Sequence, residues 1–180
     1  HYSIRNGILS GTFIESDYAS FVAWQDWGRP VAGIYDCFAA AAIAKADGAY
    51  LVGIMAEHTY NAGDIYFPCG TLDMDDIVNG KVDFEASVLR ELKEETGLGA
   101  SDVALDPDWV FVSDNELIAA IKVMRSPLAA EPLRALILET LARQRQPELA
   151  DILIVRSASD FDPNMRGFVR SFLARRFGDK

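Results

Sequence analysis

Cysteine is scarce in this chain of 180 residues, which contains two, Cys37 and Cys69. Two cysteines are too few for a disulfide framework, and their spacing is not that of a zinc site. We therefore interpret both as reduced thiols, which are usual in proteins of the cytoplasm.

Positive charge and long apolar runs are also lacking. The formal net charge is −10, which argues against binding of long nucleic acid, because that requires a basic surface. A small phosphorylated ligand remains compatible, since a bound metal ion can invert the local field. No apolar run in the sequence approaches the roughly 20 residues of a membrane span, and no secretory signal peptide is evident. We expect a cytoplasmic protein, and a first residue of His1 rather than Met is compatible with a trimmed chain.

Half of the residues are hydrophobic, enough for one domain with a sizeable core. Periodicity and turn residues predict strands at residues 35–43, 49–55, 65–67, 109–113, 117–125 and 152–155. Further helices are expected at 132–146 and from Asp162-Pro163 onward. Residues 1–34 are expected to form an arm of short strands and an aromatic helix, packed on a body of residues 35–180. Within that body we interpret the helix at about 132–146 as an insertion.

The most informative stretch is Arg90 to Leu98, which reads Arg-Glu-Leu-Lys-Glu-Glu-Thr-Gly-Leu. On a helix, Glu91, Glu94 and Glu95 project from one side, and like charges at this spacing weaken the helix. A hard divalent cation suits such an all-oxygen cluster. Asp83 is a natural N-cap and Gly97 a natural C-cap, so the sequence predicts a helix over residues 84–96.

Residues 68–98 resemble the signature of the Nudix hydrolases. That signature reads Gly, five residues, Glu, seven residues, and then Arg-Glu-apolar-any-Glu-Glu-any-Gly-apolar. Arg90 to Leu98 matches every fixed position of its second half. The preceding Pro68-Cys69-Gly70 resembles the Pro-Gly-Gly that normally opens the signature, with Cys69 in place of a glycine.

The first half of the signature departs from the family pattern. If Gly70 is its first glycine, Asp76 stands where the family has Glu. The family pattern places seven residues before the Arg, whereas residues 77–89 separate Asp76 from Arg90 in this chain. We interpret residues 71–83 as part of a loop insertion between a phosphate-proximal turn and the helix, which leaves the role of Asp76 open.

The resemblance covers about residues 35–157 and implies an α/β (α+β) fold, an α/β/α sandwich with a mixed β-sheet. It also implies a metal-dependent pyrophosphohydrolase with Mg²⁺ or Mn²⁺ as cofactor. Such an enzyme cleaves a nucleoside diphosphate linked to another moiety, such as ADP-ribose or a dinucleotide, by attack of water on a phosphorus.

The expected metal ligands follow from position in the signature and from the preference of hard cations for carboxylates. Glu91 and Glu95 are the principal candidates, and Glu94 completes the cluster directly or through water. The backbone carbonyl of Cys69 or Gly70 is a further candidate ligand. Arg90 is expected to orient the glutamates through ion pairs.

The general base is less constrained, because in this family it varies and often lies outside the signature. Glu91 itself is one candidate. Glu148 is the candidate outside the signature, because it precedes the strand predicted at 152–155, and Glu139 and Asp151 are its rivals. His58 is expected to be a surface or structural residue, with a phosphate contact as the alternative. We expect loop 71–83 or helix 132–146 to shape the substrate pocket.

Two other interpretations stay open. One is a Nudix-fold nucleotide-binding or regulatory module without catalysis, and the other is an isomerase of the same fold. The retained Glu91, Glu94 and Glu95 count against the first, because a retired site has no reason to keep three mutually repelling acids. The expected partner is a small-molecule nucleotide, with no long nucleic acid and no membrane, and the aromatic arm is compatible with a homodimer.

Overall fold

The computed structural model describes residues 2–45 and 47–178. Its helices are α1 (Tyr18–Asp26), α2 (Phe84–Thr96), α3 (Ala130–Leu141) and α4 (Gly167–Gly178). Its strands are β1 (Tyr2–Arg5), β2 (Ile8–Gly11), β3 (Asp36–Ala44), β4 (Tyr50–Met55), β5 (Ile65–Tyr66), β6 (Cys69–Gly70), β7 (Ile77–Val78), β8 (Lys81–Val82), β9 (Ala104–Asp114), β10 (Leu117–Arg125) and β11 (Leu149–Val155).

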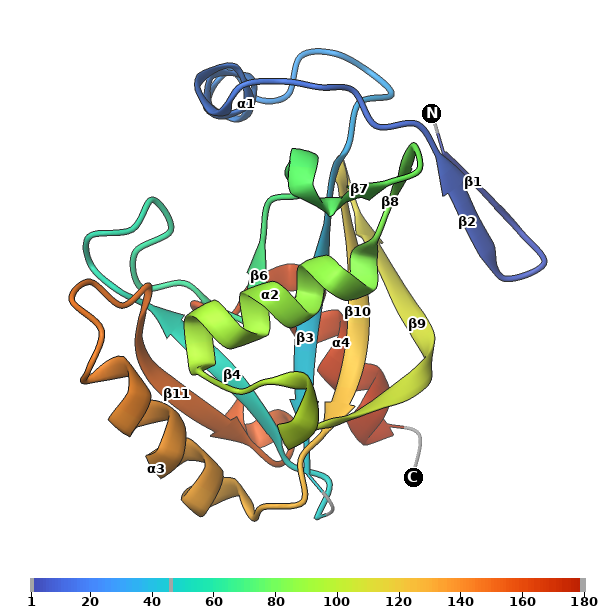
Figure 1. Cartoon of the computed structure of the whole chain (residues 1–180). Coiled ribbons are helices and arrows are strands. Elements are labelled where there is room, and N and C mark those ends of the chain that lie inside the picture. Colours follow the sequence, from blue (N-terminus) through green and yellow to red (C-terminus); the bar gives the residue numbers. More distant parts are fainter. Residues whose placement is uncertain (1, 46, 179–180) are drawn as a thin grey trace.

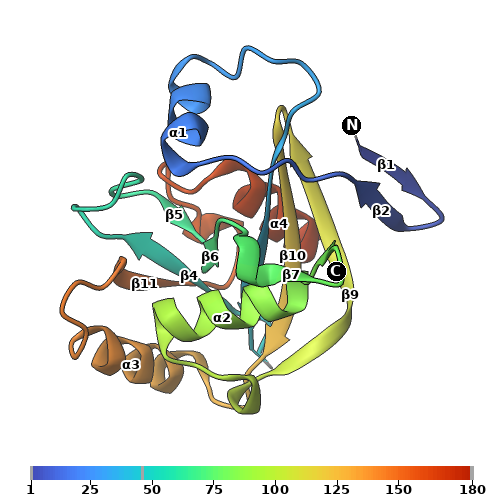
Figure 2. The same ribbon diagram turned by 45° about the horizontal axis from the view of Figure 1, so that its top comes forward.

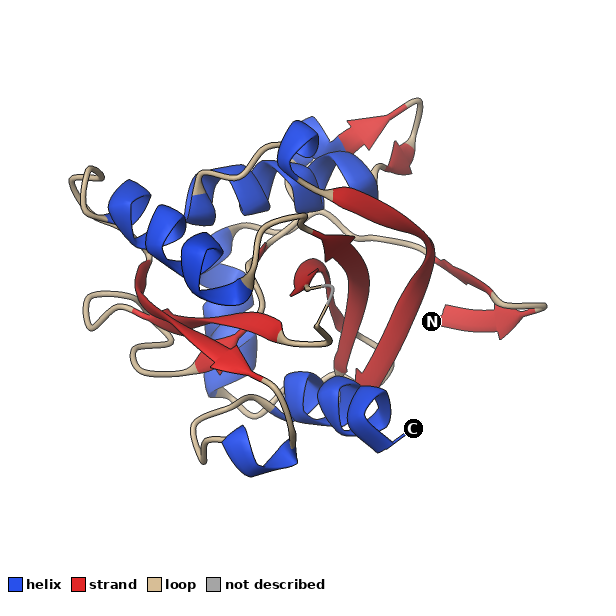
Figure 3. Ribbon diagram, turned by 90° about the horizontal axis from the view of Figure 1, so that it is seen from below, coloured by secondary structure: helices blue, strands red, loops and turns tan. Residues whose placement is uncertain are grey.

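The central sheet has the strand order β11-β4-β3-β10-β9. Strand β3 runs parallel to β10, with Asp36 opposite Leu117, and the other neighbouring pairs are antiparallel. Helices α2 and α3 lie over one face of the sheet, and α4 covers the other (Figures 1 and 3). The predicted three-layer fold with a mixed sheet is therefore confirmed.

The sheet is split between β3 and β4, which pair with each other only near one end. Farther along, β5 pairs with β4, and β6 pairs with β3 through Ala39 and Ala40. The segment that resembles the opening of the Nudix signature thus occupies the split. Its Cys69 and Gly70 are held in place by the backbone of the central strand.

The core at this point is built from very small side chains. Ala39 to Ala42 of β3 are completely buried, and α2 packs directly on this strand. Short side chains on both faces of a central strand allow the helices to approach the sheet closely. On α4, Phe168 packs edge-on against Phe38, and Phe172 against Phe67.

Some predicted boundaries were wrong. Helix α3 begins at Ala130 and ends at Leu141, whereas the sequence predicted a helix over about 132–146. Helix α4 begins at Gly167 rather than at Asp162-Pro163. The backbone just before α4 is hydrogen-bonded to β5 instead, because Asn164 O accepts from Ile65 N. Strands β9 and β11 both begin earlier than predicted.

The insertion is more ordered than the predicted loop. It contains a 3₁₀ turn at Met74–Asp76, followed by the hairpin of β7 and β8. The hairpin turns at Asn79 and Gly80, whose φ angles are 52° and 73°. Asn-Gly is the preferred sequence for a two-residue hairpin turn with positive φ at both positions. The signal was present, but the hairpin strands are only two residues long and show no alternation.

The N-terminal arm forms the predicted short strands and aromatic helix. Strands β1 and β2 make a hairpin, and the Oδ1 atom of Asp17 caps α1 by accepting from Ser20 N. The hairpin rests on the body through Tyr2, whose ring packs edge-on against Tyr35. In the part of the chain that the structure describes, no helix has the length and apolarity needed to span a membrane.

Candidate active site

Helix α2 has the bounds predicted for it, because both of its ends are fixed locally. The Asp83 carboxylate accepts hydrogen bonds from Glu85 N and Ala86 N. At the other end Gly97 adopts a φ of 78°, and its N–H donates to Lys93 O. A Cβ atom on Gly97 would lie 2.5 Å from Thr140 Cγ2, so this position needs glycine for packing as well as for conformation.

The three glutamates of α2 do not share one environment. Glu91 is 8% exposed and Glu95 is 3% exposed, and both face β6. The side chain of Glu94 is 60% exposed. The expected single cluster is thus a buried pair, four residues apart, with a third acid at its rim.

Strand β6 presses its backbone against the buried pair. Cys69 N donates to Glu95 Oε1 at 2.9 Å. A Cβ atom on Gly70 would lie 2.2 Å from the Glu91 carboxyl carbon, so any other residue at this position would force the end of the Glu91 side chain to shift. The glycine of the signature therefore allows the Glu91 carboxylate to lie close to the backbone of β6.

Arg90 joins the helix to the insertion. Its Nη1 atom lies 2.6 Å from Glu91 Oε1 and 3.6 Å from Glu94 Oε2, and its Nη2 atom lies 3.0 Å from Asp76 Oδ2. Asp76 is 3% exposed and also accepts from Asp73 N. The acid that stands in place of the family's first Glu is therefore a buried partner of Arg90, an assignment the sequence alone left open.

Burial of Glu91 and Glu95 disfavours the ionised form of both carboxyl groups. Burial raises the pKa of Glu91 to about 7, although the neighbouring Arg90 opposes the rise. Burial raises the pKa of Glu95 well above its usual range, against the hydrogen bond from Cys69 N, and Glu148 adds to the rise. Both effects follow from placing several acids together away from water.

Among the candidate bases, Glu148 is the one that the structure brings to the pair. It directly precedes β11 and contributes to the raised pKa of both Glu91 and Glu95. Its rivals are engaged elsewhere: Glu139 pairs with Arg143 at 3.7 Å, and Asp151 pairs with Arg134 at 2.5 Å.

His58, the other residue singled out near the signature, is exposed on the loop between β4 and β5. Its exposed position agrees with the surface residue expected from the sequence.

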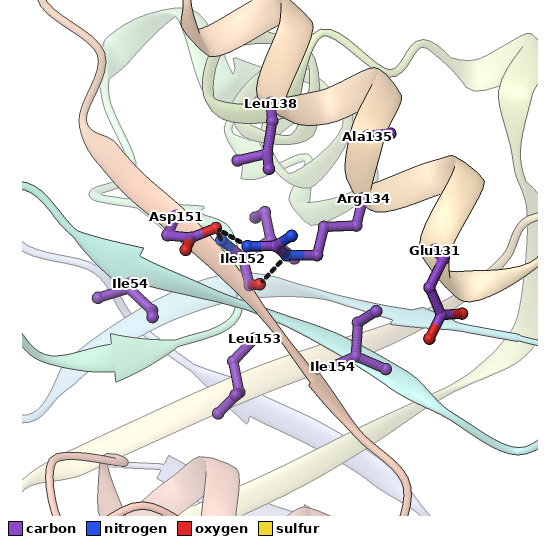
Figure 4. Close-up of a pocket in the computed structure, with 9 residues that line it drawn as sticks. All are labelled: Ile54, Glu131, Arg134, Ala135, Leu138, Asp151, Ile152, Leu153 and Ile154. Atoms are coloured by element: carbon purple, nitrogen blue, oxygen red, sulfur yellow. Dashed lines mark hydrogen bonds and ion pairs between the residues drawn. The ribbon is translucent and has the colours of Figure 1, made fainter.

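Two grooves lie outside the buried pair. One, of about 460 Å³, runs between α3 and β11, where Arg134 donates to Ile152 O and pairs with Asp151 (Figure 4). The other, of about 400 Å³, lies between the β7–β8 hairpin, the first turn of α2 and Trp109. Neither groove is lined by Glu91, Glu94 or Glu95.

The donor set at the buried pair fits a divalent cation. Glu95 Oε2 is buried and has no hydrogen-bond partner within residues 2–45 and 47–178. The neighbouring groups are the Glu91 carboxylate and the backbone of Cys69 and Gly70. Carboxylate and carbonyl oxygens are the ligands that Mg²⁺ and Mn²⁺ prefer. Within the same residues, no three His, Cys, Asp or Glu side chains are already grouped as a metal site. Glu91 Oε1 is held by Arg90 and Glu94 faces solvent, so a cation would have to draw these groups together.

Solved structures share this fold. The MutT protein from Methanosarcina mazei Go1 is 18% identical, with a TM-score of 0.50 over 81% of this chain and 95% of that chain. A hydrolase of the NUDIX family from Clostridium perfringens is 14% identical, with a TM-score of 0.50 over 80% of this chain and 97% of that chain. No protein-family model and no curated protein sequence matches the chain.

At these identities the similarity establishes the fold, which is that of the Nudix hydrolases. The resemblance recognised in Arg90 to Leu98 is confirmed at that level. Of the matching residues, Arg90 to Thr96 lie on α2, the helix whose buried face carries Glu91 and Glu95, and Gly97 and Leu98 directly follow it.

Proposed function

We propose that the chain is a metal-dependent pyrophosphohydrolase of the Nudix type. It would cleave a nucleoside diphosphate linked to another moiety. The observation that carries the proposal is the buried pair of Glu91 and Glu95, packed against the backbone of β6 with one carboxylate oxygen unpaired. Buried carboxylates without a full set of partners are destabilising, so their presence at the signature positions favours a role in binding a cation.

The residues that would hold the cation are Glu91 and Glu95, with Glu94 at the rim and a backbone carbonyl of Gly70 or Cys69. Mg²⁺ or Mn²⁺, when bound, supplies neutralisation of phosphate charge and a lowered pKa of water. Arg90 has a positioning role, because its contacts with Glu91 and Asp76 hold the Glu91 carboxylate in place.

The reaction requires a water oxygen to form a bond with phosphorus while the bond to the bridging oxygen breaks. The proton of the water passes to a carboxylate, and the leaving phosphate departs with the bridging oxygen. Glu148 is our candidate to accept the proton, and Glu91 is the alternative. The support for Glu148 is its electrostatic influence on Glu91 and Glu95, whereas Glu139 and Asp151 are paired with Arg143 and Arg134.

The remaining features follow from this proposal. The substrate is a small nucleotide such as ADP-ribose or a dinucleotide, and the enzyme acts in the cytoplasm. Residues 35–180 form the catalytic domain, with the arm of residues 1–34 packed on it. The exposed apolar residues of the arm, such as Ile8 and Trp27, favour a homodimer over a monomer.

The test is a panel of nucleoside diphosphate derivatives, assayed with Mg²⁺ or Mn²⁺ by coupled phosphate release. We expect turnover of at least one, and a loss of about a hundredfold in Glu95→Gln. Glu94→Gln is expected to lose less, because its side chain is exposed. Metal titration followed by thermal unfolding is the second readout.

Failure has three distinct forms. Absence of turnover together with absence of a metal-induced thermal shift would refute the proposal that the chain is a metal-dependent enzyme. Nucleotide binding without turnover would favour the regulatory module. Full activity in Glu95→Gln would show that the ligand assignment is wrong while the reaction class stands.

A further inference from the structure

The central sheet has two borders, β9 on one side and β11 on the other (Figures 1 and 2). Within residues 2–45 and 47–178, neither strand pairs with a further strand on its outer side. An unpaired edge presents a row of backbone N–H and C=O groups that can pair with a strand of another molecule. Both borders therefore need protection against strand addition, and they have it in different forms.

Strand β9 is protected by its own sequence. It contains Pro107, which has no N–H to offer, between Asp106 and Asp108. Its pairing with β10 is also irregular, with a shift of register between Lys122 and Met124. Proline, charge and an irregular ladder are usual means by which proteins prevent pairing at the edge of a sheet.

Strand β11 has neither proline nor a run of charges. It reads Leu-Ala-Asp-Ile-Leu-Ile-Val, with Asp151 as its one charged residue. Segments of this length with high β-propensity, little charge and no proline are prone to pair with copies of themselves. Two copies of this strand also repel each other little, although the whole chain has a formal net charge of −10. Protection of this border has to come from other contacts.

Two side chains occupy the outer edge of β11 at Ile152 (Figure 4). Arg134 Nε, from α3, donates to Ile152 O at 2.7 Å, and Asp151 Oδ1 accepts from Ile152 N at 2.6 Å. The two side chains also pair with each other, with 2.5 Å between Arg134 Nη2 and Asp151 Oδ1. One residue of an antiparallel neighbour would make the same two hydrogen bonds to Ile152. We call the pair of Arg134 and Asp151 the clasp, since it occupies the place of an added strand.

The clasp covers one residue of the edge and leaves room beside it. The backbone groups of an antiparallel strand alternate between its two edges, so those of Ile154 point to the same side as those of Ile152. The groove of about 460 Å³ between α3 and β11 is lined by Ile152, Leu153 and Ile154. A strand that displaced the clasp would therefore gain the backbone groups of both Ile152 and Ile154.

We propose that the clasp closes β11 against strand addition, and that its opening lets two copies of the chain join their central sheets through β11. Two β11 strands related by a twofold axis are antiparallel and self-complementary. The N–H and C=O groups of Ile152 in each copy then replace Arg134 and Asp151 for the other. This inference goes beyond the proposed function and does not depend on it. It also uses a different surface from the arm, so the association it describes adds to any pairing through the arm.

The test compares self-association of the unaltered chain with that of three variants. Arg134→Met keeps the apolar stem of the side chain and removes its donors and its charge. Asp151→Asn keeps an acceptor for Ile152 N and removes the charge that holds Arg134. Arg143→Met is the matched control, because it removes the same charge from a side chain that is 79% exposed and pairs with Glu139. Light scattering after size exclusion measures mass at several protein concentrations, and mass spectrometry measures amide hydrogen exchange in β11.

We expect Arg134→Met to form a larger species at a concentration at least about tenfold lower than the unaltered chain does. That factor corresponds to the loss of one competing hydrogen bond from a charged group. Asp151→Asn should show a smaller change in the same direction, and Arg143→Met should behave as the unaltered chain. In the larger species, the amide hydrogens of Ile152 and Ile154 should exchange more slowly than in the dilute variant.

Three results would overturn the inference. The first is an unchanged mass for Arg134→Met and Asp151→Asn, with both variants folded by circular dichroism. The second is equal association of Arg143→Met, which would show an effect of net charge alone. The third is association without slower exchange at Ile152 and Ile154, which would place the contact elsewhere. If Arg134→Met does not fold, the first and third criteria are applied to Asp151→Asn, which keeps the size of the original side chain.

Discussion

The two halves of the signature region are both rich in acids but use them in opposite ways. In the insertion, Asp73 accepts from Asp75 N, and Asp76 accepts from Asp73 N and pairs with Arg90. In α2, Glu95 receives one backbone hydrogen bond, and its other oxygen has no partner in the described residues. The acids of the insertion therefore stabilise its own backbone, whereas Glu95 of α2 keeps one carboxylate oxygen without a partner in the described residues.

This difference separates a structural acid from a candidate functional one. Spacing alone cannot make the distinction, since Asp76 and Glu91 are both acidic signature positions and both buried. What distinguishes Asp76 from Glu91 is that a backbone N–H of the insertion, that of Asp73, donates to its carboxylate. The three predictions that follow act on α2, on the junction between the halves, and on an acid outside both.

Gly70→Ala should have the largest effect, because it acts directly on the α2 acids. The added methyl group would fall 2.2 Å from the Glu91 carboxyl carbon and displace it. We expect kcat to fall about a hundredfold, as is typical of a misplacement of about 1 Å. Gly99→Ala is the control, since its nearest neighbour, Asp102 Oδ2, lies 3.6 Å away. Equal activity in both variants would show that Glu91 does not need its present position.

Asp76→Asn tests the junction between the halves. The change removes the charge that faces Arg90 and leaves the guanidinium with less compensation. Breaking a buried ion pair costs about 3–5 kcal/mol, and we expect about 2 kcal/mol because Arg90 is partly exposed. Urea unfolding measures the loss, with the exposed Asp75→Asn as control. If both variants unfold at the same urea concentration as the unaltered chain, Asp76 does not anchor the insertion.

Asp36→Asn should have the smallest effect and concerns an acid that belongs to neither half. Burial raises the pKa of Asp36 to about 6, so the folded state favours its protonated form. The contribution of protonated Asp36 to the free energy of unfolding is fully present below the ordinary pKa of an aspartate. It is lost as the pH rises through about 6. An asparagine at this position has an amide that does not ionise, so Asp36→Asn should stabilise the protein more at pH 8 than at pH 5.

The expected difference between the two pH values is about 1 kcal/mol in the free energy of unfolding. Urea titrations of both proteins at pH 5 and pH 8 measure it. A stabilisation that does not depend on pH would mean that Asp36 is ionised normally in the folded protein.

What the sequence predicted well is what local interactions determine. The bounds of α2 followed from Asp83 and Gly97, whose roles involve only their neighbours in the chain. The start of α4 could not be predicted the same way, because Asn164 is bound to Ile65, far away in sequence. At the site, the glutamates were identified from spacing. The buried state of Glu91 and Glu95, and the pairing of Arg90 with Asp76, depend on how β6 and the insertion pack.

The parallel pairing of β3 with β10 has a consequence for the order in which the site assembles. Asp36 lies opposite Leu117, so the whole of α2 is synthesised before β3 can acquire this neighbour. Pairings between distant segments form slowly, because the intervening chain must first be ordered. A nascent chain that ends before β10 already contains α2 and β6, but it lacks the parallel neighbour of β3, the strand on which α2 packs. The strand that supports the candidate site therefore completes its pairing only after all the acids of α2 have been made.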